Sequence, residues 1–117
     1  MIEKMIQEFL SAGLDVPVLL EVPEGPDIPE RFVIIEKIAG GKRNHLRTAS
    51  FAIQSYSLVS LYDAAALDGQ VQGAMDDMAA LLPNIGACRM ASNYNFTDVS
   101  TKRYRYQCTY DITYVEV

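Results

Sequence analysis

The side chains that most often carry chemistry are few in this sequence, and they are not grouped. His45 is the only histidine, and Asp76 and Asp77 are neighbours on a predicted helix, where adjacent side chains diverge by about 100°. Cys88 and Cys108 lack the CxxC spacing of zinc and redox sites, so each is interpreted as a buried free thiol. A bridge between them would require their two strands to pair in register. These residues predict no enzyme, no metal site and no cofactor.

A basic stretch, GGKRNHLR, occupies residues 40–47 and has the glycines and the lysine of a phosphate-binding loop. It lacks the GxxxxGK(S/T) pattern, however, and it leads into a predicted strand rather than into a helix N-terminus. We interpret it as the exposed tip of a hairpin that contacts an acidic partner surface or passing DNA. The candidate interface residues of this loop are Lys42, Arg43, His45 and Arg47.

The stretch KRYRYQCTYDITY at residues 102–114 alternates in the manner of a strand, with tyrosine and other apolar side chains on one face and polar ones on the other. One interpretation is a face packed under a helix, and the alternative is a subunit interface, where Tyr and Arg are enriched. The candidate interface or core-edge residues are Arg103, Tyr104, Arg105 and Tyr106. A platform for single-stranded nucleic acid is a third interpretation, but neighbouring Arg and Tyr side chains point to opposite faces.

The composition is that of one ordinary folded domain over residues 1–117, with 50% hydrophobic and 21% charged residues. No apolar run is long enough to cross a bilayer, and no signal peptide is visible, so we expect neither membrane insertion nor secretion. The net charge of −5 disfavours nonspecific binding to nucleic acid. Acids gather in residues 15–36, whereas six of the ten bases lie in 42–47 and 102–105, which favours contacts between unlike charged surfaces.

The pattern of apolar residues predicts seven elements. We expect helices over residues 2–13 and 57–82, the second capped by Ser60 with Asp63, and strands over 16–22, 31–38, 48–56, 87–96 and 102–115. Pro17 favours an edge position for the first strand, a loop covers 23–30, and Gly40 and Gly41 end the second strand. The expected class is α+β, with an antiparallel or mixed sheet of about five strands, two helices on one face, and the order α-β-β-β-α-β-β.

The long helix is the largest predicted element, and its apolar positions follow a helical period. The predicted core stripe is Ala64, Leu67, Val71, Ala74, Met78 and Leu81. Gly69 and Gly73 lower its intrinsic stability, so they indicate close backbone packing, a kink, or a helix that begins later.

Five segments together resemble a known family. VPVLLEVPEGPDIPERFVIIEKIAGG, ASFAIQSYS, YDAAALDGQV, YNFTD and KRYRYQCTYDI are similar to the small tail-terminator or head–tail completion proteins of long-tailed phages and of prophages in Firmicutes-type bacteria. The similarity extends over essentially the whole chain. Its most specific parts are residues 29–41 and 51–57.

The resemblance implies a noncatalytic virion structural protein, assembled in the cytoplasm of the bacterial host. Such a protein would form a homo-oligomeric ring of six copies that terminates the tail tube. Its partners would be the tail tube protein and the head connector protein, with DNA passing through the lumen of the ring. Another head–tail adaptor or minor capsid component is the alternative, and a small single-stranded nucleic-acid-binding domain is a further one.

Overall fold

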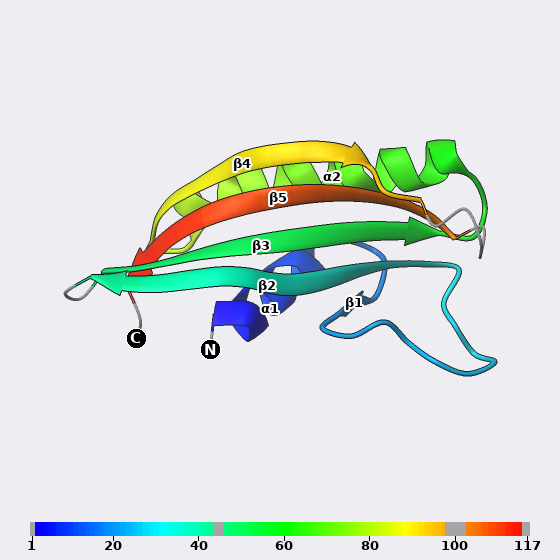
Figure 1. Ribbon diagram of the computed structural model, residues 1–117, viewed down its shortest axis with the longest axis horizontal. Helices are drawn as coiled ribbons and strands as arrows, with labels where there is room; N and C mark the ends of the chain where they lie inside the picture. Colours follow the sequence, from blue (N-terminus) through cyan, green and yellow to red (C-terminus); the bar gives the residue numbers. More distant parts are fainter. Residues whose placement is uncertain (1, 44–45, 98–102, 116–117) are drawn as a thin grey trace.

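In a computed structural model, which describes residues 2–43, 46–97 and 103–115, two helices cover one face of a five-stranded mixed sheet (Figure 1). The strand order is β1-β2-β3-β5-β4, and this confirms the predicted α+β class and order of elements. The molecule is elongated, measuring 44 × 25 × 24 Å. The elements are α1 (Ile2–Gly13), β1 (Val18–Leu19), β2 (Arg31–Arg43), β3 (Leu46–Ser57), α2 (Leu61–Leu81), β4 (Ile85–Asn95) and β5 (Tyr104–Val115).

The first strand is much shorter than predicted. Of the expected residues 16–22, only Val18 and Leu19 join the sheet, and they pair in parallel with Val33 and Ile34 of β2. Pro17 has no N–H to donate, and the chain beyond Leu19 leaves the sheet for the proline-containing segment. The predicted edge position is confirmed, and most of the outer edge of β2 has no neighbouring strand within the described part of the chain.

The expectation that Gly40 and Gly41 end the second strand was wrong. Strand β2 continues to Arg43, with Gly40 opposite Ala49 and Gly41 opposite Thr48, after a bulge between Lys37 and Ala39. Glycine is tolerated here because the Lys37 side chain fills the space beside Gly40, where an added Cβ would lie 2.9 Å from the Lys37 Cε. The β2–β3 hairpin is therefore a long paired ribbon rather than a short hairpin with a wide loop.

The long helix begins at Leu61, four residues after the predicted start, because β3 extends to Ser57. The predicted cap is confirmed: the backbone N–H of Asp63 donates to the Ser60 Oγ over 3.0 Å. The Asp63 carboxylate then accepts from the Ser57 hydroxyl at 2.7 Å and from the Arg31 Nε at 2.9 Å. This node joins the start of α2 to β2 and β3. No described helix has the length and apolar character needed to cross a membrane.

The main core lies between the helices and the sheet. Leu67, Val71 and Met78 are buried as predicted, but Met75 takes the central position expected for Ala74, which is half-buried. Leu81 is 64% exposed, because the last turn of α2 reaches past the packed stripe. The side chains of the sheet that pack against the helices are Val33, Ile35, Ala49, Phe51, Ile53, Cys108, Tyr110, Ile112 and Tyr114. This confirms the packed-face interpretation of the tyrosine strand from Cys108 onward.

The two glycines of α2 make no close packing contact with the described part of the chain. Gly69 and Gly73 are both exposed, and an added Cβ would meet no atom within 4 Å at either position. The helix also runs unbroken through them from Leu61. Neither close backbone packing nor a later helix start explains these glycines.

A second, smaller cluster lies on the face that the helices leave open. Phe32, Ile34 and Tyr56 are buried there, and the rings of Phe32 and Tyr56 stack with centroids 4.7 Å apart. Leu19 of β1 and Ile28 of the proline-containing segment pack against them. Strand β2 is thus covered on both faces over its first half, as its apolar pattern predicted.

Candidate interaction surfaces

One end of the molecule is basic. The hairpin end, defined as Lys37, Lys42, Leu46, Arg47 and Val115, lies where β2 and β3 run to the left of Figure 1. The whole stretch from residue 37 to 57 contains four bases and no acid. Lys37 and Lys42 are exposed and Arg47 is half-buried. The backbone of Arg43 belongs to β2, whereas its side chain and His45 lie outside the described residues.

The opposite end of the long axis carries an acidic segment, and the bases Arg31 and Arg105 lie at the same end. The acidic segment, residues 20–30, leaves β1 and returns at Arg31, at the right of Figure 1, and its four acids are all exposed: Glu21, Glu24, Asp27 and Glu30. Strand β2 starts beside this segment and ends at the hairpin end. A 13-residue strand spans about 40 Å. The elongated fold therefore places the acidic segment and the hairpin end far apart along its long axis.

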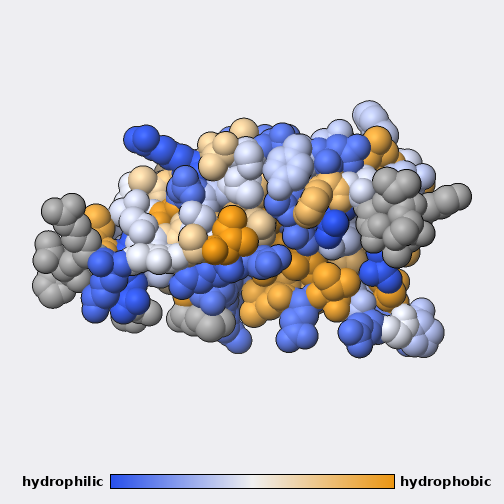
Figure 2. Space-filling view, in the orientation of Figure 1, coloured by the Kyte–Doolittle hydropathy of each residue, from blue (hydrophilic) through white to orange (hydrophobic). Residues whose placement is uncertain are grey.

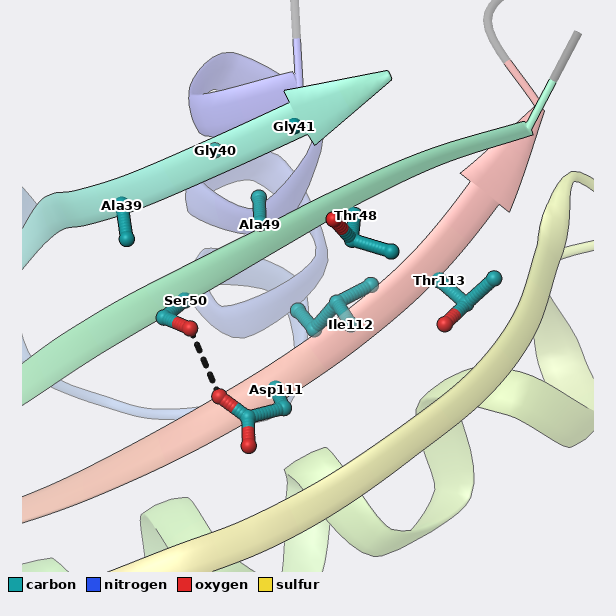
Figure 3. Close-up of a pocket in the computed structure, with 9 residues that line it drawn as sticks. All are labelled: Ala39, Gly40, Gly41, Thr48, Ala49, Ser50, Asp111, Ile112 and Thr113. Atoms are coloured by element: carbon teal, nitrogen blue, oxygen red, sulfur yellow. Dashed lines mark hydrogen bonds between the residues drawn. The ribbon is translucent and has the colours of Figure 1, made fainter. Parts of the chain in front are cut away.

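A shallow depression of about 370 Å³ lies on the open face beside the hairpin end (Figure 3). Ala39 and Gly41, which pair with Ser50 and Thr48, leave it open because they have little or no side chain. Across it the Ser50 hydroxyl donates to a carboxylate oxygen of Asp111 at 2.6 Å. In Figure 2 hydrophilic residues surround this end of the face. Its size and polarity suit one side chain of a docking partner better than an enclosed substrate.

A hydrogen-bonded network crosses the other half of the open face. The Arg105 guanidinium donates to the Tyr56 hydroxyl at 2.8 Å, and that hydroxyl donates to the Gln54 amide oxygen at 3.2 Å. Gln54 in turn donates to Gln107 at 2.9 Å, and Gln107 donates to the Tyr94 hydroxyl. The network joins β3, β5 and β4. Each Gln is buried, at 7% exposure, so its amide needs these partners.

Arg105 is held in one orientation at the end of this network. Its Nε donates to the carbonyl of Phe96 at 2.8 Å, and its guanidinium carbon lies 4.2 Å from the Phe96 ring centroid and 5.3 Å from that of Tyr56. The aromatic partners of Arg105 therefore come from other segments, while its sequence neighbour Tyr106 belongs to the opposite face, as predicted. A fixed, half-buried guanidinium with remaining N–H donors can receive an anionic or planar group.

The predicted site residues do not form one site. Arg103, Tyr104, Arg105 and Tyr106 are half-buried at the start of β5, where Arg105 lies opposite Tyr56. Arg47 lies nine positions away from Tyr56 on β3, which corresponds to about 30 Å. The structure thus separates the two candidate sets. The amide network was not predicted. Gln54 and Gln107 are 53 residues apart, and no local sequence pattern indicates that their strands pair.

Both cysteines are free thiols, and both have a raised pKa. Cys88 lies opposite Ile112 and Cys108 opposite Asn93, so the two strands do not bring the thiols into register. Burial, assisted by the charge of Asp76, raises the pKa of Cys88 from 9.0 to about 11. Burial is also the main cause that raises the pKa of Cys108. Because the thiolate is the nucleophile, neither thiol is activated at neutral pH.

A buried carboxylate joins α2 to the edge strand β4. Asp68 is 2% exposed, and its Oδ2 accepts from the amides of Gln72 and Asn93, each at 2.7 Å. Its Oδ1 has no hydrogen-bond partner among the residues that the structure describes. No cluster of three or more potential metal ligands occurs among the described residues. The arrangement indicates a structural clamp.

The chain matches no protein-family model and none of the curated proteins searched. Its function is therefore inferred from its own residues and their arrangement.

Proposed function

We propose that this chain is a noncatalytic structural subunit of a phage or prophage virion, a tail terminator whose ring closes the tail tube and joins it to the head connector. The observation that carries the proposal is the charge separation: a basic hairpin end and an acidic segment lie at opposite ends of one elongated subunit. Two unlike ends favour head-to-tail contacts between copies, and such contacts close into a ring when the rotation is suitable.

Two further features support a binding role over a catalytic one. The described surface offers shallow depressions such as the one in Figure 3, and both thiols stay protonated at neutral pH. In this proposal the basic hairpin end meets a neighbouring copy, the tail tube protein or DNA in the lumen. The expected assembly has six copies, as the resemblance in the sequence implies.

The test is the mass of the assembly, measured by sedimentation with and without tail tubes of the same phage. We expect ring-sized particles, or binding of the chain at tube ends that prevents further tube growth. A chain that stays monomeric and ignores the tubes refutes the proposal. If the purified protein instead binds isolated connector rings without tubes, it is a different head–tail adaptor or a minor capsid component.

A second candidate function is single-stranded nucleic-acid binding, and the fixed Arg105 is the observation that favours it. Arg105, Phe96 and Tyr94 gather cation and aromatic groups on the open face, as base-stacking surfaces do. This function predicts retention on single-stranded DNA at low salt that declines steeply as salt rises. Loss of that retention in Arg105→Ala would support it, whereas no retention at low salt removes it.

A further inference from the structure

A groove of about 560 Å³ runs between the end of α1 and the C-terminal half of α2. Its floor is mostly small or apolar, and no side chain projects into it from Gly13 or Gly73, where an added Cβ would meet nothing within 4 Å. Leu81 borders it and is 64% exposed. The residues that line it are Phe9, Ala12, Gly13, Leu14, Gln70, Gly73, Ala74, Asp77 and Leu81.

The surroundings of this groove are negative. Asp77 of α2 lines the groove and its neighbour Asp76 is exposed, whereas Asp63 is paired with Arg31 and Asp68 is buried toward β4; α2 contains no lysine or arginine. Neither α1 nor α2 has a basic residue in its last turn, so the carbonyl ends of both helices keep their partial negative charge. Asp15 follows α1 directly and is exposed. The groove therefore suits a segment that is both apolar and cationic.

The hairpin end of the same chain has this complementary character. Leu46 and Val115 lie opposite each other in register and are 47% and 48% exposed. Lys42 is exposed beside them, within a stretch that has no acid from residue 37 to 57. The β2–β3 ladder is paired up to Arg43 and Leu46, so this end is the far end of a continuous two-stranded ribbon.

We propose that the groove between α1 and α2 binds the hairpin end of a second copy of this chain. The contact joins two different surfaces, so each copy binds one neighbour through its hairpin end and another through its groove. Leu46 and Val115 cover the apolar floor, and Lys42 approaches Asp77. This inference rests on the proposed function: it keeps head-to-tail assembly through the hairpin end, and it names the groove between α1 and α2, rather than the acidic segment, as the surface that the hairpin end meets.

The two exposed glycines of α2 provide a matched pair of variants. Gly73 lines the groove and Gly69 does not, although both are helical positions without nearby atoms. Leucine at either position fits the free subunit, but Gly73→Leu fills the groove. In sedimentation experiments we expect Gly73→Leu to raise the dissociation constant for self-association about tenfold or more, as blocking a central contact does. Gly69→Leu should leave it unchanged.

A charge exchange tests the pairing itself. Lys42→Glu and Asp77→Lys should each weaken self-association, and the double variant should recover most of it. If the Gly73→Leu variant assembles as the wild type does, the proposed groove contact is wrong, but the proposed ring function is not affected. A wild-type chain that remains monomeric, alone and on tail tubes, overturns both. If Gly73→Leu reduces tube binding by a monomeric chain, the groove binds the tube protein and the second-copy proposal is wrong.

Discussion

Replacing the two exposed glycines of α2 by alanine should stabilise the protein. Glycine in a helix interior costs about 0.8–1.0 kcal/mol relative to alanine, because more backbone freedom is lost on folding. A glycine is required only where an added Cβ would collide with a neighbouring atom. At Gly69 and Gly73 it would meet nothing within 4 Å, so alanine is accommodated without any change in the surroundings.

The expected gain is about 1 kcal/mol for each variant and just under 2 kcal/mol for the pair. Unfolding entropy near 2.1 cal/mol/K per residue gives about 0.25 kcal/mol/K for 117 residues. Each kcal/mol therefore corresponds to about 4 °C in Tm, and the double variant should melt about 7 °C higher. Against a typical total of about 5–15 kcal/mol, such a gain is easily measured.

The assay is thermal and urea denaturation followed by far-ultraviolet circular dichroism on the wild type, both single variants and the pair. Gly25→Ala is the control, because Gly25 has φ of +93°, where a side chain is strained; it should lose about 1 kcal/mol. A loss of stability in Gly69→Ala or Gly73→Ala would refute the reasoning, since it would mean that α2 packs closely at that glycine.

Three other perturbations follow from the core. Met78→Asp should leave the chain unfolded by circular dichroism, because Met78 is 0% exposed and an unpaired buried charge costs several kcal/mol. Asn93→Leu deprives the buried Asp68 carboxylate of a donor and should cost about 1–3 kcal/mol in urea denaturation, with Asp68→Leu in the same chain recovering most of it. The free energy of unfolding should fall from pH 9.0 toward about 11, because folded Cys88 keeps its proton after the unfolded thiol has ionised. Urea titrations across this pH range should show a shallower decline in the free energy of unfolding for Cys88→Ser than for the wild type. An equally steep decline in the variant would contradict the raised pKa of Cys88.

The limits of prediction are clearest at the glycines. Gly40 and Gly41 are expected to break a strand, yet the neighbouring strand holds them in the ladder and the Lys37 side chain fills the space beside Gly40. Gly69 and Gly73 are expected to indicate close backbone packing, a kink or a later helix start, yet the helix begins at Leu61 and an added Cβ would meet nothing within 4 Å at either position. Local propensity describes what a glycine allows, whereas its neighbours in space decide which possibility is realised.

The candidate site shows a similar division. Charge segregation was visible in the order of residues, and so was the alternation that buries Tyr110 and Tyr114. The position of the two charged segments at opposite ends depends on the length and pairing of β2, and the Arg105 network depends on strands that are far apart in the sequence. The order of the strands in the sheet brings such residues together, and no local sequence pattern specifies that order.

The sequence by itself determined the elements, their order and the α+β class, because apolar period and capping residues are local properties. The buried half of the tyrosine strand follows from the same alternation. Only the tertiary structure decided that α2 buries Met75 while Leu81 stays exposed, that a groove opens beside Gly73, and that Lys42 and Arg105 lie at different ends. These features arise from contacts between distant segments, whose geometry is set when the sheet and helices pack together.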